Sequence, residues 1–442
     1  MMLNISLLAL TLWGDILVGP FQVAEAQPKH HQVSMRAAMA ADGRFAIAWV
    51  DSLQFPDHFE IDLFVRFFDR DGIPLTDAYK IAKLTDTTTW VYDPRLDMDS
   101  AGNAVLVWTD GRTMSSTKLS TIRFQAFAPD GTPLDSAKTL YSEVDISVAT
   151  PVSLANNGEF AIVFNTKLAG QWGNWVQRFD LAGVPQDSAF LAHDTLPETV
   201  PPSSFIYPQV ALNDAGDVVV TWLHWIYSPH IYPRFQVFDR NDKPILPWEP
   251  KGYRIDDGDT QAHACRPDPR WIDNDRFVVF WTDCFIPPYN NPVPLVGRVF
   301  SQKGTVKHPI RKVLLDSLFC NAGDPNGRFY TAVLPDGHFA LAHTRSHMYP
   351  YPDDPFKYYS WAHAGGILGQ VVNDEPWRRT TIFEVSAPFG SDTLFNFWDH
   401  RCHYDSPPAV AACNDRLVWV YTRFNPDTIF EAWAVITDWD MG

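Results

Sequence analysis

A six-residue apolar phrase recurs along this chain at nearly constant spacing and constrains the fold more than any other feature. The copies of this repeat phrase occupy residues 44–49, 103–108, 159–164, 217–222, 276–281 and 338–343. The last residues of successive copies lie 59, 56, 58, 59 and 62 positions apart. A repeat with a fixed period of tens of residues is typical of propellers, solenoids and other arrays.

Each repeat contains four stretches that favour β-strands. The repeat phrase is rich in β-branched and aromatic residues and follows a turn such as Asp42-Gly43, as expected for a buried strand. A strand-like stretch before each turn, for example residues 209–212, supplies the other arm of a hairpin. A third stretch ends in a turn such as Asp71-Gly72, and a short fourth stretch leads into the next repeat. We therefore predict an all-β chain folded as a single β-propeller with four-stranded blades.

The number of blades depends on the C-terminal part of the chain. After residue 343, either of two apolar stretches could form the second strand of the next blade. Residues 394–398 keep the spacing of the repeat, and residues 417–421 come later. Only one of them can open a full blade, because 21 residues follow Tyr421. Seven blades is the natural total, and six or eight are the alternatives.

The N-terminal segment, residues 1–26, supports two interpretations. Its apolar run at residues 3–13 and the small-residue pattern Ala24-Glu25-Ala26 are typical of a signal peptide. However, no basic residue precedes the run, and Asp15 interrupts the stretch before the cleavage pattern. The alternative is a ring-closing N-terminal strand, because residues 16–23 resemble the fourth strand of other repeats. Residues 27–442 form the propeller in both cases, and the apolar run is too short and broken to span a membrane.

Five cysteines favour an oxidising compartment, where disulfides persist. Cys265 and Cys284 lie at similar distances from a predicted hairpin turn, so we expect them to face each other across two strands, as a disulfide requires. Cys402 and Cys413 have the same symmetrical arrangement. Two disulfides would leave Cys320 over, and five reduced core thiols are the alternative. No C-x-x-C pair is present, so a zinc site is not expected.

The repeating unit resembles that of a large group of uncharacterised repeat propellers in exported bacterial proteins. Their blades read D-G-x-F-V-V-V-W, then D-x-R, then Q-R-F-D-x-x-G. Here the first motif corresponds to residues 42–49, the second to residues 110–112 and the third to residues 177–180 with Gly183. The resemblance covers nearly the whole chain but consists of structural residues. It implies a propeller fold and export, and it implies no particular activity.

The sequence contains no known nucleophile motif, zinc-protease motif or phosphate-binding loop, so we predict no catalytic residue, cofactor or metal ion. The stretches after the second strand of blades four to six are long and aromatic, and we predict them to be loops on one face of the ring. Rigid aromatic rings lose little entropy on binding and suit sugars or peptides. Packing of these rings onto the blades is the alternative. The predicted binding residues are Trp225, Tyr227, His230, Tyr232, Tyr289, Arg345, His347, Tyr349, Tyr351 and Asp353.

Acidic and basic residues recur at the rim, where the second strand of a blade ends. They are Asp51, Asp110, Asp283, Asp399, Arg112, Arg345, Arg401 and Arg423. We favour a repeated Asp–Arg brace, because a feature copied from blade to blade is structural. The alternative is a site in which arginines bind a carboxylated ligand and paired carboxylates act on a glycosidic bond.

These features predict an exported protein, located outside the cell, in the periplasm or at the cell surface. We expect it to bind a glycan or a protein, without catalysis, through the loop face of blades four to six. The alternatives are a carbohydrate-active hydrolase or lyase using the rim residues, and a structural component of the cell envelope. The net charge of −17 argues against nucleic acid as a partner, because binding phosphates needs a basic face. The ligand and the oligomeric state do not follow from the sequence.

Overall fold

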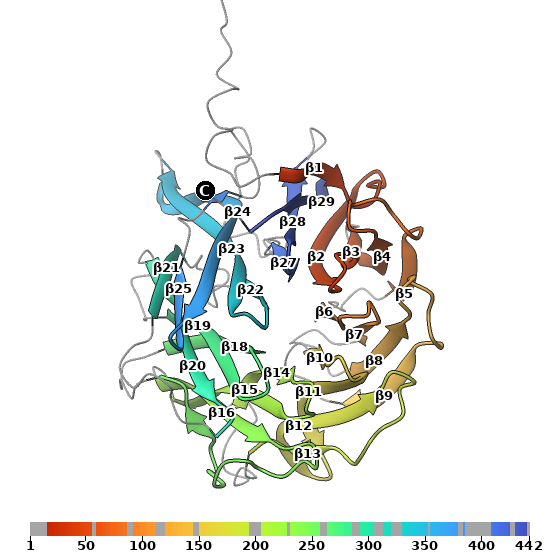
Figure 1. The fold of residues 1–442 in the computed structure, drawn as a ribbon. Helices are drawn as coiled ribbons and strands as arrows, with labels where there is room; N and C mark the ends of the chain where they lie inside the picture. Colours follow the sequence, from red (N-terminus) through yellow and green to blue (C-terminus); the bar gives the residue numbers. More distant parts are fainter. Residues whose placement is uncertain are drawn as a thin grey trace, which may run out of the picture.

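The protein is a β-propeller of seven blades around a central channel (Figure 1). The computed structural model describes residues 16–54, 59–85, 92–110, 120–144, 150–193, 205–227, 230–256, 263–284, 292–303, 313–319, 329–351, 354–378, 383–384, 408–424 and 429–439. Every regular element in these segments is a β-strand. The all-β, seven-blade prediction is confirmed. Within the same segments, no helix is long and apolar enough to cross a membrane.

Each blade is an antiparallel sheet whose first strand is innermost. Blade one contains β2 (His30–Met39), β3 (Phe45–Gln54), β4 (Phe59–Phe68) and β5 (Tyr79–Thr85). Blade two contains β6 (Tyr92–Met98), β7 (Ala104–Asp110), β8 (Ser120–Phe127) and β9 (Lys138–Val144). Blade three contains β10 (Val152–Leu154), β11 (Glu159–Leu168), β12 (Gln171–Asp180) and β13 (Phe190–Leu191). Blade four contains β14 (Phe205–Leu212), β15 (Val218–Tyr227), β16 (His230–Phe238) and β17 (Tyr253–Arg254).

The remaining blades follow the same plan. Blade five contains β18 (His263–Trp271), β19 (Arg276–Cys284), β20 (Pro292–Ser301) and β21 (Val313–Phe319). Blade six contains β22 (Phe329–Val333), β23 (His338–Tyr351), β24 (Asp354–Val372), β25 (Glu375–Arg378) and the short β26 (Phe383–Glu384). Blade seven contains β27 (Ala409–Cys413), β28 (Arg416–Phe424), β29 (Phe430–Thr437) and β1 (Ile16–Gln22).

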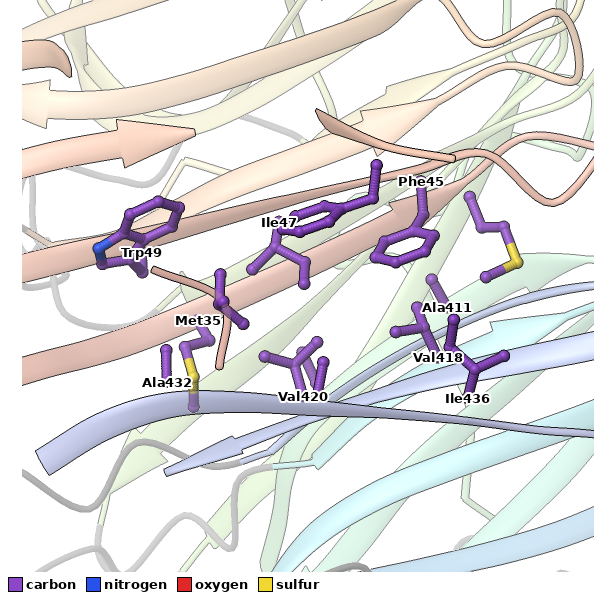
Figure 2. Close-up of a cluster of buried hydrophobic side chains, with 14 of the residues drawn as sticks. Met35, Phe45, Ile47, Trp49, Ala411, Val418, Val420, Ala432 and Ile436 are labelled. Atoms are coloured by element: carbon purple, nitrogen blue, oxygen red, sulfur yellow. The ribbon is translucent and has the colours of Figure 1, made fainter. Parts of the chain in front are cut away.

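The hydrophobic core is divided among the interfaces between blades. In the described segments, seven clusters of buried apolar side chains occupy the seven contacts between neighbouring blades. The repeat phrase supplies residues to every one of them, because alternate side chains of its strand point to opposite faces of the blade. Figure 2 shows the cluster between blades one and seven, where Phe45, Ile47 and Trp49 of β3 lie with Val418 and Val420 of β28. Burying each such large side chain stabilises the fold by roughly 1.5–3 kcal/mol.

Arginines at the first position of the repeat phrase join neighbouring blades. They lie on the turn face, the face of the ring that carries the turns between the first and second strands. Arg44 of blade one donates to the carbonyls of Ala101 (3.1 Å) and Pro129 (2.9 Å) in blade two. Arg276 of blade five forms an ion pair with Asp374 of blade six at 2.8 Å. In blade one the turn before the phrase ends in Gly43, whose φ of +90° suits glycine. These contacts are repeated and structural.

Blade seven is built from both ends of the described chain. Its second strand is β28, which contains residues 417–421, the later of the two stretches predicted as candidates for this strand. The other candidate, residues 394–398, lies outside the described segments. Strand β1 pairs antiparallel with β29 as the fourth strand of this blade. The backbone N–H of Val23 donates to Ala432 at 2.9 Å, and Val23 is fully buried. This pairing closes the ring.

The closure predicts a measurable effect of the β1 side chains on stability. The Phe21 ring packs against Phe68, with ring centroids 5.9 Å apart, and lies over Gly72. We expect Phe21→Ala to lower the free energy of unfolding by about 2 kcal/mol, because a half-buried ring loses part of the cost of a full core truncation. Urea unfolding followed by tryptophan fluorescence measures this change.

Ile73→Ala is the matched control, because Ile73 is next in sequence to Gly72, which the Phe21 ring contacts, but is itself 62% exposed. Its substitution should change the free energy of unfolding by less than about 0.5 kcal/mol. Equal unfolding midpoints for the Phe21 and Ile73 variants would contradict a closing role for β1.

Candidate functional site

The innermost strands of all seven blades enclose a cavity of about 270 Å³ in the central channel. Its lining comes from β2, β6, β10, β14, β18, β22 and β27 and the residues next to them. Because the inner edge of each of these strands faces the channel, the cavity is walled by backbone as well as by side chains. It is the one place in the described segments where residues from every blade meet.

The side chains that line this cavity differ from blade to blade. Opposite the fifth position of the repeat phrase lie Arg36, Arg95, Gln209, Asp268 and Tyr330. Opposite the third position lie Asp97, Ser153 and Arg270, and alanine occupies this place in the other four blades. The outer parts of the blades repeat, whereas the channel positions do not.

A β-bulge at the same place in several blades sets the direction of these side chains. The pairing register shifts immediately before Arg36, Arg95, Gln209 and Asp268. Such bulges bend a strand and redirect the side chain that follows. A proline precedes the last three of these residues, which costs no ladder hydrogen bond at an inner edge that is unpaired.

An aromatic ring spans part of the channel. The guanidinium of Arg36 in blade one lies 4.0 Å from the centroid of the Tyr330 ring in blade six, and that of Arg95 lies 5.8 Å from it. Blade seven separates these two blades and contributes only small residues there, such as Ala409 and Ala411. Cation–π contacts of this kind contribute roughly 0.5–2 kcal/mol, depending on solvation. The ring of Tyr330 is therefore fixed within the cavity.

A second polar group joins blades five and six. Arg270 donates from Nε to the Thr331 hydroxyl at 2.8 Å and from Nη2 to Asp268 at 3.4 Å. The Thr331 hydroxyl in turn donates to Asp268 at 2.5 Å. The three side chains hold one another in place, so the guanidinium plane of Arg270 has a defined orientation at the cavity wall.

Two channel residues join neighbouring innermost strands. Asp97 accepts the backbone N–H of Leu154 in blade three at 2.7 Å, and Ser153 accepts that of Leu212 in blade four at 3.0 Å. Burial raises the pKa of Asp97, and the positive charge of Arg270 opposes that shift. These contacts make the cavity wall rigid.

The rim residues contact strands of their own blades wherever their side chains are described. Asp51 hydrogen-bonds His30, Asp110 pairs with Arg123 at 2.5 Å, and the Arg423 guanidinium lies 4.9 Å from the Trp433 ring centroid. Burial raises the pKa of both Asp51 and Asp110. These contacts within each blade are those expected of the structural Asp–Arg brace. The side chains of Asp283 and Arg345 and residues 112, 399 and 401 lie outside what the structure describes.

The prediction of long loops in blades four and six is wrong. Strand β15 continues to Tyr227 and β16 starts at His230, while β23 continues to Tyr351 and β24 starts at Asp354. Aromatic residues favour extended pairing, and this preference outweighs the prolines, which suggested loops. The predicted binding residues of these two blades thus belong to projecting hairpins rather than to irregular loops.

One of the predicted binding residues has a described side chain. The ring of Tyr232 stacks with the guanidinium of Arg254 at 4.3 Å, and Arg254 forms two hydrogen bonds of 2.6 Å with Asp256. Tyr232 therefore packs within blade four. Only backbone positions are described for Trp225, Tyr227, His230, Arg345, His347, Tyr349 and Tyr351, and Tyr289 and Asp353 lie outside the described segments. The predicted set therefore stays a prediction, with Tyr232 as its one member whose side chain is described.

The strand register corrects the expected geometry of one cysteine pair. Cys265 lies opposite Thr282 and Cys284 lies opposite His263, so the two cysteines do not face each other directly. Cys413 is buried, has no disulfide partner among the described residues and donates to Asp415 at 3.2 Å, while Cys402 and Cys320 lie outside the described segments. The two disulfides stay predictions.

Sequence reasoning missed the channel residues Arg36, Arg95, Asp268, Arg270 and Tyr330. Their signal was present as charged or aromatic residues inside the innermost strands. Three of them also follow a proline directly, in Pro94-Arg95, Pro267-Asp268 and Pro269-Arg270. A proline next to a charge in a strand indicates an unpaired inner edge rather than a sheet interior.

No known family model matches the chain, and no curated protein sequence matches it. Among solved structures, an ulvan lyase described as a new family of polysaccharide lyase has a TM-score of 0.50 at 8% identity, over 94% of this chain and 96% of that one. An ulvan lyase of that family bound to -[GlcA(1-4)Rha3S]- has a TM-score of 0.50 at 9% identity, over 93% and 94% of the chains. An α-L-arabinofuranosidase of Fusarium graminearum has a TM-score of 0.45 at 12% identity, over 95% and 97%. At these identities the likeness shows the propeller fold alone.

One histidine at the rim makes stability depend on pH. His224 lies two residues after Trp222, as Asp51 and Asp110 follow their tryptophans, and it is 6% exposed. Burial lowers its pKa from 6.5 to about 4, with a smaller contribution from the charge of Arg234. Above pH 6.5 the imidazole is neutral in both states; as the pH falls towards 4, only the unfolded chain takes up the proton.

We therefore expect this histidine to remove about 2 kcal/mol of stability between pH 7 and pH 5. In His224→Gln that part of the pH dependence should disappear, so the variant should lose less stability than the wild type over this range. Urea unfolding at pH 7, 6 and 5 measures the difference. Parallel curves for the two proteins would show that folding does not lower the pKa of His224.

Proposed function

We propose that this protein binds a carbohydrate, without catalysis, at the channel and the adjoining hairpins of blades four to six. The observation that carries the proposal is the asymmetry of the channel. At the channel position opposite the third residue of the repeat phrase, alanine is enough in four of the seven blades. Charged and aromatic residues concentrated in some blades give one ligand-sized cavity a distinct chemistry.

The cavity combines a flat ring with hydrogen-bond donors in fixed positions. Tyr330 offers an aromatic face near the guanidinium of Arg95, and Arg270 is a second partly exposed arginine in the wall of the same cavity. Ligand sites typically join apolar walls to a few well-placed polar groups. The volume of about 270 Å³ corresponds to about nine water molecules, so it suits one sugar residue of a longer chain. Further residues of the ligand would lie along the projecting hairpins, which carry Trp225 and Tyr351.

Export and an extracellular, periplasmic or surface location belong to this proposal as its cellular setting. The likeness in fold to an ulvan lyase solved with -[GlcA(1-4)Rha3S]- supports a saccharide as the ligand class. A protein ligand is the competing outcome, and it would be indicated by pull-down of a partner in the absence of any saccharide binding.

A hydrolase or lyase is the second candidate, because two carboxylates, Asp97 and Asp268, lie in the cavity wall. The contacts of both favour a structural role. Asp97 accepts backbone N–H groups with both oxygens, and Asp268 accepts from Thr331 and Arg270. A general acid or base needs an oxygen directed at the substrate. New reducing ends or unsaturated products after incubation with a bound polysaccharide would favour the enzyme.

The proposal predicts that a saccharide found on a glycan array loses at least tenfold in affinity for Tyr330→Ala. Loss of the ring removes a stacking surface, and a tenfold loss corresponds to about 1.4 kcal/mol. Tyr330→Phe should keep most of the affinity, because it keeps the ring. Calorimetric titration with the saccharide measures all three proteins.

Tyr79→Ala is the matched control, because Tyr79 is a 44% exposed tyrosine on the outermost strand of blade one. Its affinity should equal that of the wild type. Unchanged binding by Tyr330→Ala would refute the channel as the site. Unchanged binding after Trp225, Tyr289 and Tyr351 are all replaced by Ala would refute the role of the blade hairpins.

A further inference from the structure

The charge of the channel wall is opposite in sign to that of the whole chain. The protein carries a net charge of −17, yet three arginines and two aspartates line the cavity. The arginines are Arg36, Arg95 and Arg270, from blades one, two and five. Their convergence from three separate blades is a property of the ring and not of any local segment.

Both aspartates of the cavity are engaged by the protein itself. Asp97 accepts the N–H groups of Met98 at 3.0 Å and Leu154 at 2.7 Å, one on each oxygen. Asp268 accepts from Thr331 and Arg270. The three arginines outnumber the two aspartates in the cavity wall. The excess of charge presented to a ligand is therefore positive.

Arg270 is the guanidinium best placed to meet a ligand. Its side chain is 30% exposed, and its described contacts use Nε and Nη2. Within the described segments no hydrogen bond or ion pair involves Nη1. A guanidinium whose plane is fixed at one edge can offer the remaining donors to a carboxylate or sulfate with little further loss of entropy.

Arg95 and Arg36 flank the Tyr330 ring and differ in exposure. Arg36 is 4% exposed and lies 4.0 Å from the ring centroid, so it acts as a positioning residue for the ring. Arg95 is more exposed and lies farther from the ring, at 5.8 Å. It is the second guanidinium that a ligand at the Tyr330 face would meet.

We infer that the sugar residue held in the channel is acidic, and that Arg270 and Arg95 bind its carboxylate or sulfate group. This inference rests on the proposed function, because it names the chemical class of the ligand for the same site. The overall negative charge does not oppose it. At physiological salt, charges more than about 8 Å apart in solvent are largely screened, whereas charges inside a cleft with low-dielectric walls are not.

The test compares acidic and neutral polysaccharides that share a backbone. Polygalacturonate is paired with its carboxyl-reduced form, and dextran sulfate is paired with dextran, so the two arms separate carboxylate from sulfate. Binding is measured by calorimetric titration on the full chain at low and at physiological salt. We expect the wild type to bind the acidic member of at least one pair at least tenfold more tightly, with affinity falling as salt rises.

Arg270→Gln and Arg95→Gln should each lose at least tenfold in affinity for the acidic polysaccharide and leave affinity for its neutral partner unchanged. Arg270→Lys should lose part of the affinity, because it keeps the charge and loses the planar fork. Arg70→Gln is the control, because Arg70 is an exposed arginine paired with Asp415 at the turn face. Thermal unfolding of each variant shows whether the fold is intact.

The outcomes separate the two claims. Equal binding of acidic and neutral members, unaffected by Arg270→Gln but lost in Tyr330→Ala, overturns the acidic ligand and leaves carbohydrate binding at the channel standing. Binding of no saccharide on a broad array, acidic or neutral, overturns the proposed function and the inference with it. Acidic preference that persists in both arginine variants places the anion elsewhere and refutes the assignment of Arg270 and Arg95.

Discussion

Every blade of this protein buries two apolar faces, and each face is covered only by the neighbouring blade. The seven hydrophobic clusters lie between blades, so none of them exists in a single blade. An open chain of blades would expose one face and one strand edge at each end, which favours aggregation. The packing of blade seven on blade one, with β1 paired to β29 as the last strand, therefore closes the structure (Figure 1). This pairing places segments more than 400 residues apart in one sheet and turns a linear repeat into a ring.

Ring closure also creates the site. The innermost strands converge only because all seven blades are present, and Arg36 of blade one meets Tyr330 of blade six across the small residues of blade seven. Hydrogen bonds from one innermost strand to the next, such as that between Leu154 and Asp97, keep the wall in place. A cavity built this way is preformed, so a ligand pays little ordering entropy on entering it.

The fold was predictable from the sequence because it depends on three local signals. These are the spacing of the repeat phrase, the turn residues before it, and the alternation of side chains along each strand. The channel was not, because it depends on register. The bulge between Cys265 and Asp268 illustrates the difficulty: one extra residue changes which side chains face the channel and contributes to the cysteines lying out of register. The prediction of loops in blades four and six was wrong for another reason. Pro233 and Pro350 suggested loops, yet both lie in paired strands, opposite Leu223 and Tyr358.

The channel residues divide into those that closure needs and those that it does not. Asp97 and Ser153 accept backbone N–H groups of the next blade, so their polarity has a structural use. Arg270 instead contacts the side chains of Thr331 and Asp268, and alanine serves at its position in four other blades. Placing a guanidinium and a phenol in a partly buried channel costs desolvation free energy that a purely structural ring would avoid. Departures of this kind from an otherwise consistent pattern are expected at functional sites.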